Sequence, residues 1–454
     1  MTDAIMKPLA DLAADLAAGR TTSLALTEAA LARIDDPAGE GARAFITVYH
    51  QSALDAAKAS DQARAHGAVP SPLAGIPVSI KDLCDVSGEI TLAGSIVRRD
   101  AEAAAQDAPT VARLRAAGAV IVGRTNMVEF AMGALGTNAH YGTPKNPWDR
   151  ATGRVPGGST SGGAVSVSDG MAAAALGTDT AGSVRIPAAL CGMAGFKPTA
   201  RRVSKHGIYP LSRTLDSVGP LAPTVACCAL VDAIFAGEAP PRLRSLPVRG
   251  MRLGVPKHLV LDDLDNDVAV AFERCLSKLS AGGAQIDHID FPELARIPVI
   301  NRIGGFSTAE AFAVHREILA RSGNQYDQNI AARIRLGESW SAADYFDLID
   351  IRADMIAAAN ARTAPYDAMI MPTLPVVACP IDDVAEAEAW TNMNKLLLRN
   401  TIPANFLDRC ALTVPCHEGG RAPVGLMLMG EAMADLPLLE IGQAVEACVN
   451  PSLA

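Results

Sequence analysis

The sequence lacks the short patterns by which metal and redox sites are usually recognised. It contains no CxxC, and its eight histidines form neither HxxxH nor HExxH, so we expect no zinc site. The nine cysteines are scattered along the chain, and an odd number without paired spacing predicts free thiols in a reducing compartment.

A long apolar run and a positive net charge are also missing. No stretch of 18 apolar residues occurs, and Asp3, Asp11 and Asp15 interrupt the first 20 residues, so we expect neither a membrane span nor a signal peptide. The 40 basic and 49 acidic side chains give a formal charge of −9, which argues against nucleic acid or an anionic membrane as a partner. These absences favour a cytoplasmic protein without such partners.

Charged residues make up only 20% of the 454 positions, whereas hydrophobic residues make up 49%. This balance predicts a large packed core and excludes intrinsic disorder. Strand-like and helix-like segments alternate, as in the strand expected at 77–83, the helix at 108–117 and the strand at 119–123. Such alternation is typical of an α/β fold with a mostly parallel, buried sheet. The first 65 residues are rich in alanine and predict helices.

Residues 153–199 are unusually rich in glycine and serine. A flexible linker is one interpretation, although apolar sequence flanks this glycine- and serine-rich segment. A phosphate-binding loop is a second, but neither GxxxxGK[ST] nor GxGxxG is present. The third is a nucleophilic serine, because Ser183 lies in a tight glycine turn before a segment that can start a helix. Backbone N–H groups converge at such a turn, as an oxyanion hole requires.

A serine nucleophile needs a base, which is usually a histidine. No histidine near these segments lies in a recognisable motif, and the GxSxG pattern of many serine hydrolases is also absent. Lysine is scarce, with nine lysines against 31 arginines, yet Lys81 ends the apolar strand that includes residues 78–80. Burial favours the neutral amine, which can act as a general base. The alternative is a lysine at a strand end that reaches water.

Several long motifs, in one order, resemble the amidase signature family of serine hydrolases. The similarity runs from about residue 20 to 445 and is densest over 70–225. The matching text is GIPVSIKD (75–82), GRTNMVEFAMG (123–133), YGTPKNPWD (141–149), PGGSTSGG (156–163), LGTDTAGSVRIPAALCGMAGFKPT (176–199), RVSKHGIYPLSRTLDSVGP (202–220), PANFLDRCALTVPC (403–416) and PVGLMLMG (423–430).

The resemblance implies a Ser–Ser–Lys triad. Carried onto this sequence, Ser183 is the nucleophile, Ser159 is the bridging serine and Lys81 is the base. In the family the bridging serine follows a cis peptide, so the Gly158–Ser159 bond is expected to be cis. The implied chemistry is a proton relay that lets Ser183 attack an amide carbonyl to form an acyl-enzyme, with no cofactor.

The resemblance also implies residues that support the triad. A glycine is common where Ala181 stands, so a left-handed backbone there would be strained. The backbone N–H groups of Thr180, Ala181, Gly182 and Ser183 are implied as oxyanion donors. Substrate contacts are expected at Met132, Gly133 and Ser161, and supporting hydrogen bonds at Thr160, Asp179 and Arg185, with Thr160 and Ser161 bracing Ser159 or Lys81.

The implied fold is a single large α/β domain, with a central mixed, mostly parallel sheet covered by helices on both faces. We expect a helical N-terminal segment over residues 1–65 that packs on the catalytic domain, residues 66–454. The core motifs occupy 70–225, and a variable pocket region lies at about 300–346.

Two activities follow from the resemblance. The first is an amidohydrolase that cleaves a small carboxamide to an acid plus ammonia or an amine, as a monomer or a homodimer. The second is the glutaminase subunit of a tRNA-dependent amidotransferase, which works in a complex. A non-catalytic scaffold is disfavoured, because all three triad positions are present.

The substrate is the least determined feature. The segment 300–346 carries polar groups that could face the pocket, and an inward arginine would favour a carboxylated substrate. Each of these residues could instead lie on a solvated helix face. If Phe306, Phe312 and Met132 line the cavity, an aryl or aliphatic amide fits better. The polar candidates are Glu310, His315, Arg316, Tyr326 and Arg333.

Overall fold

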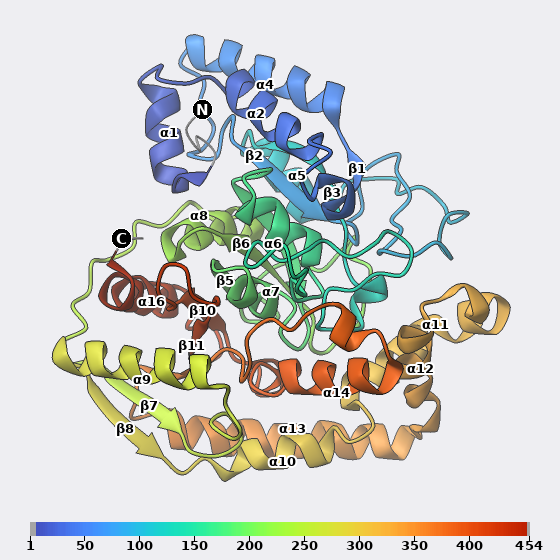
Figure 1. Cartoon of the computed structure of the whole chain (residues 1–454), viewed down its shortest axis with the longest axis vertical. Helices are drawn as coiled ribbons and strands as arrows, with labels where there is room; N and C mark the ends of the chain where they lie inside the picture. Colours follow the sequence, from blue (N-terminus) through green and yellow to red (C-terminus); the bar gives the residue numbers. More distant parts are fainter. Residues whose placement is uncertain (1–5, 452–454) are drawn as a thin grey trace.

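The computed structural model describes residues 6–451. Residues 1–5 of the expected N-terminal segment and residues 452–454 of the expected catalytic domain therefore lie outside the described residues. Among the helices of the described residues, none is both long and apolar enough to cross a membrane. The chain forms one α/β unit built around a single large sheet (Figure 1).

Eleven strands form this sheet, in the order β1-β3-β2-β4-β6-β5-β10-β11-β9-β7-β8. Most are buried along their whole length, because helices cover both faces. Their bounds are β1 Phe45–Val48, β2 Pro77–Lys81, β3 Val120–Thr125, β4 Ala174–Asp179, β5 Ala194–Lys197, β6 Ser217–Ala222, β7 Arg252–Pro256, β8 Gln285–Ile289, β9 Ala368–Pro372, β10 Ala411–Pro415 and β11 Gly425–Met429.

The sheet is mixed, as expected, but parallel pairing does not predominate. Strands β3, β2 and β4 run parallel near one end, and β9, β7 and β8 run parallel at the other. The pairings from β4 through β6, β5, β10 and β11 to β9 are all antiparallel. The expectation of a mostly parallel sheet is therefore wrong for the centre. Apolar strands buried on both faces look alike in sequence whichever way they run.

Two helical layers enclose the sheet. Helices α7 and α8 both pack on β5 and β6 but have different helix neighbours, α6 for α7 and α5 and α16 for α8, which indicates that they cover opposite faces. On the α8 side lie α5 Pro109–Ala116, α8 Val225–Ala236, α9 Asn266–Ala281 and α16 Asp435–Val449. On the α7 side lie α2 Ser23–Ile34, α3 Gly41–Ala44, α6 Ser161–Ser168 and α7 Arg185–Leu190.

Most of the remaining helices lie outside these layers, although α4 also contacts β3, and two of them begin at clear capping signals. Helix α13 begins with the capping box that Ser341 and Asp344 form, and α12 begins where Asp327 accepts the N–H of Asn329. These helices are α1 Leu9–Ala17, α4 His50–Ala65, α10 Pro292–Ile300, α11 Gly305–Ser322, α12 Gln328–Arg335, α13 Ala342–Thr363, α14 Ala387–Leu398 and α15 Ile402–Phe406, with short 3-10 helices η2 Glu129–Ala131, η3 Gly323–Gln325, η4 Leu336–Ser339 and η5 Asp382–Val384.

The N-terminal segment packs on the sheet through α2 and α4, which contact β3. It is not helical throughout, because β1 pairs antiparallel with β3 and forms the edge of the sheet. This strand lies between α3 and α4. A four-residue edge strand carries too little periodicity to be distinguished from its helical surroundings.

Candidate active site

Lys81 and Ser159 form the buried centre of the site. Lys81 is the last residue of β2 and is fully buried. Its Nζ lies 2.8 Å from the Oγ of Ser159 and 2.9 Å from the Oγ1 of Thr178. Burial lowers the pKa of the Lys81 amine to about 7, even though the carboxylates of Asp179 and Asp216 act in the opposite direction. About half of the lysine is therefore a neutral amine at neutral pH.

The strand arrangement explains how Lys81 meets Thr178. Strands β2 and β4 are parallel neighbours, with Ile80 opposite Leu176. The carboxyl ends of both strands therefore lie at the same edge of the sheet, where ligands of α/β proteins commonly bind. Thr178 was not among the expected site residues, because register between strands cannot be derived from one sequence.

Backbone hydrogen bonds hold the segment that carries Ser159 against residues 128–134. The Gly158–Ser159 peptide bond is cis. The N–H of Gly158 donates to the carbonyl of Ala134 at 2.6 Å, and the carbonyl of Ser159 accepts the N–H of Val128 at 3.1 Å. The segment 128–134 thus lies directly against the bridging serine.

Ser183 lies in the turn between β4 and α7, with 5% of its surface exposed. Its carbonyl accepts the N–H of Thr160 at 3.3 Å, which places the two serine segments side by side. In the part of the chain that the structure describes, the Ser183 hydroxyl makes no hydrogen bond to Ser159. The structure therefore contains the contact between Lys81 and Ser159 of the implied relay, without the contact between the two serines.

Asp179 fixes the turn that carries Ser183. Its carboxylate forms a fully buried ion pair with Arg185, with contacts of 2.9 and 3.0 Å. It also accepts the backbone N–H groups of Gly182 at 2.8 Å and Val184 at 3.2 Å. Burial disfavours the charged carboxylate, but the neighbouring guanidinium outweighs this effect and lowers the pKa of Asp179 to about 2.

The four implied oxyanion donors differ in availability. The N–H of Gly182 is engaged by Asp179 and is not free. Within residues 6–451, the N–H groups of Thr180, Ala181 and Ser183 have no acceptor. Ala181 does not adopt a left-handed backbone; the positive φ, +139°, falls on Gly182, where a Cβ would lie 2.3 Å from the Oγ1 of Thr401.

A C-terminal segment for which no site role was expected braces this turn, although Asn405 lies within the motif at 403–416. Arg185 donates to the carbonyl of Thr401 at 2.9 Å and to the Oδ1 of Asn405 at 2.6 Å. The hydroxyl of Thr401 donates to the carbonyl of Ala181 at 2.6 Å. These residues follow α14 and are more than 200 positions from the turn, so only the fold could reveal them.

The residues implied as substrate contacts are all buried or closely packed. Met132 is buried and follows η2, and a Cβ on Gly133 would lie 3.1 Å from the ring of Trp390. The hydroxyls of Thr160 and Ser161 are buried and have no partner among residues 6–451. Neither hydroxyl braces Ser159 or Lys81, contrary to expectation; Thr178 contacts Lys81 instead.

The polar candidates of the variable region separate into distinct environments. Glu310 accepts hydrogen bonds from three hydroxyl groups on neighbouring elements, and Arg316 is exposed. His315 is buried and lies 3.0 Å from the hydroxyl of Tyr326. Arg333 differs from the rest, because its half-buried guanidinium has no partner in the described chain and its Nε is buried.

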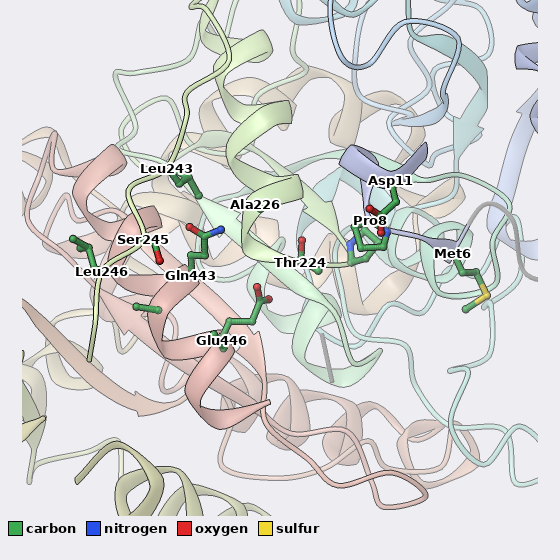
Figure 2. A pocket seen from close by; sticks show the side chains of 13 residues that line it. Met6, Pro8, Asp11, Thr224, Ala226, Leu243, Ser245, Leu246, Gln443 and Glu446 are labelled. Atoms are coloured by element: carbon green, nitrogen blue, oxygen red, sulfur yellow. The ribbon is translucent and has the colours of Figure 1, made fainter. Parts of the chain in front are cut away.

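A cavity of about 790 Å³ lies away from this site. It is bounded by the N-terminus of α1, the start of α8 and the end of α16 (Figure 2). Glu446 lines it and accepts the N–H of Val225. Among the described residues, no group of three or more histidine, cysteine, aspartate or glutamate side chains is arranged to hold a metal ion.

Comparison with known proteins identifies the family. The family model described as Amidase matches residues 25–439. The 2-amino-5-chloromuconic acid deaminase of Comamonas testosteroni is 38% identical over 401 residues, which is 88% of this chain and 87% of the relative. A glutamyl-tRNA(Gln) amidotransferase subunit of Chloroflexus aggregans is 35% identical over 95% of this chain and 94% of the relative.

Solved structures agree with this assignment. A crystal structure of an amidase matches with a TM-score of 0.88 at 32% identity, over 98% of this chain and 100% of the other. The native peptide amidase of Stenotrophomonas maltophilia matches with a TM-score of 0.80 at 29% identity, over 97% and 96% of the two chains. This chain therefore belongs to the amidase family and is a hydrolase that acts on carbon–nitrogen amide bonds.

Proposed function

We propose that this protein is a stand-alone amidase that hydrolyses a small carboxamide through an acyl-enzyme on Ser183. The observation that carries the proposal is the hydrogen bond between the buried Lys81 amine and Ser159, 2.8 Å long. An amine with a pKa near 7 can accept a proton at neutral pH and return it, as a general acid–base group must.

The acylation step begins when the substrate binds and Ser183 turns toward Ser159. Ser183 passes its proton to Ser159 while Ser159 passes its own to Lys81, and the Ser183 Oγ bonds to the substrate carbonyl carbon. The free N–H groups of Thr180, Ala181 and Ser183 support the developing oxyanion, because they have no other acceptor among the described residues.

The relay then runs in reverse. The Lys81 ammonium returns its proton through Ser159 to the substrate nitrogen, the C–N bond breaks, and ammonia or an amine leaves. Water next attacks the acyl carbon and gives a proton to the same relay. The ester bond to Ser183 breaks, the hydroxyl regains its proton, and a carboxylic acid is released.

The proposed substrate carries a carboxylate in its acyl portion. Arg333 supports this class, since a guanidinium without an acidic partner is an unused site for bidentate binding of a carboxylate. It belongs to α12, whose N-cap Asp327 donates its N–H to Glu129 of η2 at 2.8 Å. The relative from Comamonas testosteroni is likewise named for an acid.

The second candidate is the glutaminase subunit of an amidotransferase. The relative from Chloroflexus aggregans, similar over almost its whole length, favours it. The two functions differ in their need for partners: a stand-alone amidase turns over substrate as the purified chain. The glutaminase subunit is expected to hydrolyse glutamine appreciably only with its partner subunits.

The decisive experiment measures ammonia release by the purified chain over a panel of amides. The panel contains succinamate, a ureido acid, malonamide, glutamine, benzamide and indole-3-acetamide, with Ser183→Ala as the matched control. Release that disappears in Ser183→Ala supports the proposal, and preference for succinamate or the ureido acid supports the substrate class. Release that persists in Ser183→Ala, or glutamine turnover only with partner subunits, would reject it.

A further inference from the structure

The side-chain amide of Asn394 is only half satisfied. Asn394 is fully buried in α14, and its Oδ1 accepts the backbone N–H of Ala134 at 2.8 Å. An N–H group can only donate, so the amide oxygen has to face Ala134 and the NH₂ group has to face elsewhere. Within residues 6–451, that Nδ2 is buried without any acceptor.

The position of α14 places this group beside the active site. Near its middle, Trp390 covers Gly133. Just beyond its end, Thr401 contacts the nucleophile turn through the carbonyl of Ala181.

Two hydrogen bonds connect Asn394 to the bridging serine. The N–H of Ala134 donates to Asn394, and the carbonyl of Ala134 accepts the N–H of Gly158, whose peptide bond leads to Ser159. Met132 and Gly133, the residues expected to contact substrate, directly precede Ala134. The unpaired NH₂ group is thus attached to the wall that the substrate is expected to meet.

A second buried asparagine shows what a purely structural amide does here. Asn400 lies six positions further along and is equally buried. Its Nδ2 donates to the carbonyls of Val260 and Pro372, both at 2.9 Å, which uses both of its hydrogens. Buried donors are normally paired in this way, and an orphan in a native structure calls for an explanation.

We propose that the Nδ2 of Asn394 donates a hydrogen bond to a carboxylate oxygen of the substrate and thereby selects its acyl chain. This inference rests on the proposed function, and it adds a neutral donor to the cationic Arg333. The two residues lie on α14 and α12, which pack against each other. Charge from Arg333 attracts the carboxylate, and the rigidly held amide of Asn394 determines its distance from Ser183.

Asn394→Asp is the most informative variant, because it keeps an oxygen for Ala134 and removes the donor. Asn394→Ala removes both and serves as a second variant if the aspartate prevents folding. Asn400→Ala is the matched control, since it removes an equally buried amide whose hydrogens are already used. The probe is a fluorophosphonate, which labels an activated serine and needs no known substrate.

The experiment measures how succinate and butyrate, a matched charged diacid and monoacid pair, slow labelling of the full-length chain. We expect succinate to protect the wild-type protein. Asn394→Asp and Asn394→Ala should need at least tenfold more succinate for half-protection, with less than a threefold change for butyrate. Asn400→Ala should shift neither acid selectively.

The outcomes separate this inference from the proposed function. Labelling that is absent in the wild type, or that survives Ser183→Ala, would reject the nucleophile and with it both proposals. Labelling at Ser183 without protection by succinate would reject the inference alone. An equal loss of protection by both acids in the Asn394 variants would also overturn it, because the amide would then be only structural.

Discussion

The amine of Lys81 lies 2.8 Å from the hydroxyl of Ser159, and the same amine also contacts the hydroxyl of Thr178 at 2.9 Å. Among residues 6–451, this lysine has hydroxyl partners but no carboxylate within hydrogen-bonding distance. Its charged form is therefore poorly stabilised, and its pKa falls to about 7. This pKa suits Lys81 to the proposed role of a base at neutral pH without a histidine.

The first prediction concerns the dependence of activity on pH. Because the neutral amine is the active form, kcat/KM should rise with pH through about 7 and level off above it. Below that pH, activity should fall about tenfold per unit. A rate profile between pH 5 and 9, measured with an amide found in the panel, checks this. A flat profile would contradict the role of Lys81.

The second prediction concerns removal of the amine. Lys81→Met preserves the length of the side chain and removes the base, so kcat should fall by about 10²–10⁴-fold. Thermal unfolding should not show a loss of stability, because a costly buried amine is replaced by an apolar group. Lys395→Met, in α14, is a control for loss of a lysine elsewhere. Near-normal turnover in Lys81→Met would exclude the relay.

The third prediction tests Thr178, which the sequence motifs did not assign. Thr178→Val keeps the shape of the side chain and removes the second hydrogen bond to Lys81. The amine then has one partner fewer in its charged form, so the midpoint of the pH profile should move to lower pH. A fall in kcat without movement of the midpoint would indicate that Thr178 only packs against its neighbours.

The sequence predicted the local chemistry better than the long-range contacts. Lys81 at the end of an apolar strand and Ser183 in a glycine turn are both recognisable from neighbouring residues. Thr178, Asn394 and Asn405 are not, because their roles depend on which strands and helices become neighbours. The antiparallel centre of the sheet was missed for a related reason: burial on both faces removes the alternation that would indicate how a strand is paired.

The fourth prediction concerns the ion pair that holds the nucleophile turn. Asp179→Asn leaves the guanidinium of Arg185 buried without its counter-charge, which should destabilise the protein by about 3–5 kcal/mol. The partly exposed pair of Arg154 and Asp149 is the comparison, and Asp149→Asn should cost much less, because solvent screens this pair. Chemical denaturation of both variants measures the difference. Equal small losses would show that the buried pair is dispensable.

The fifth prediction concerns Glu446, whose carboxyl lines the cavity of Figure 2 and accepts the N–H of Val225 at 3.0 Å. Burial raises its pKa from 4.5 to about 8. A carboxyl with a raised pKa in the folded state costs no stability below pH 4.5 and an increasing amount up to pH 8, because the unfolded chain loses the proton more readily. Glu446→Gln keeps an oxygen for Val225 and cannot ionise.

The difference in melting temperature between Glu446→Gln and the wild-type protein should therefore shift in favour of the variant as the pH rises from 5 to 9. Glu440, on the same helix, provides the opposite case: its hydrogen bonds to Arg244 lower its pKa. Its contribution to stability is present above the unfolded-state pKa and is lost as the pH falls, so Glu440→Gln should be most harmful at neutral and higher pH. If both variants showed the same pH dependence, the buried carboxyl of Glu446 would not be protonated in the native protein.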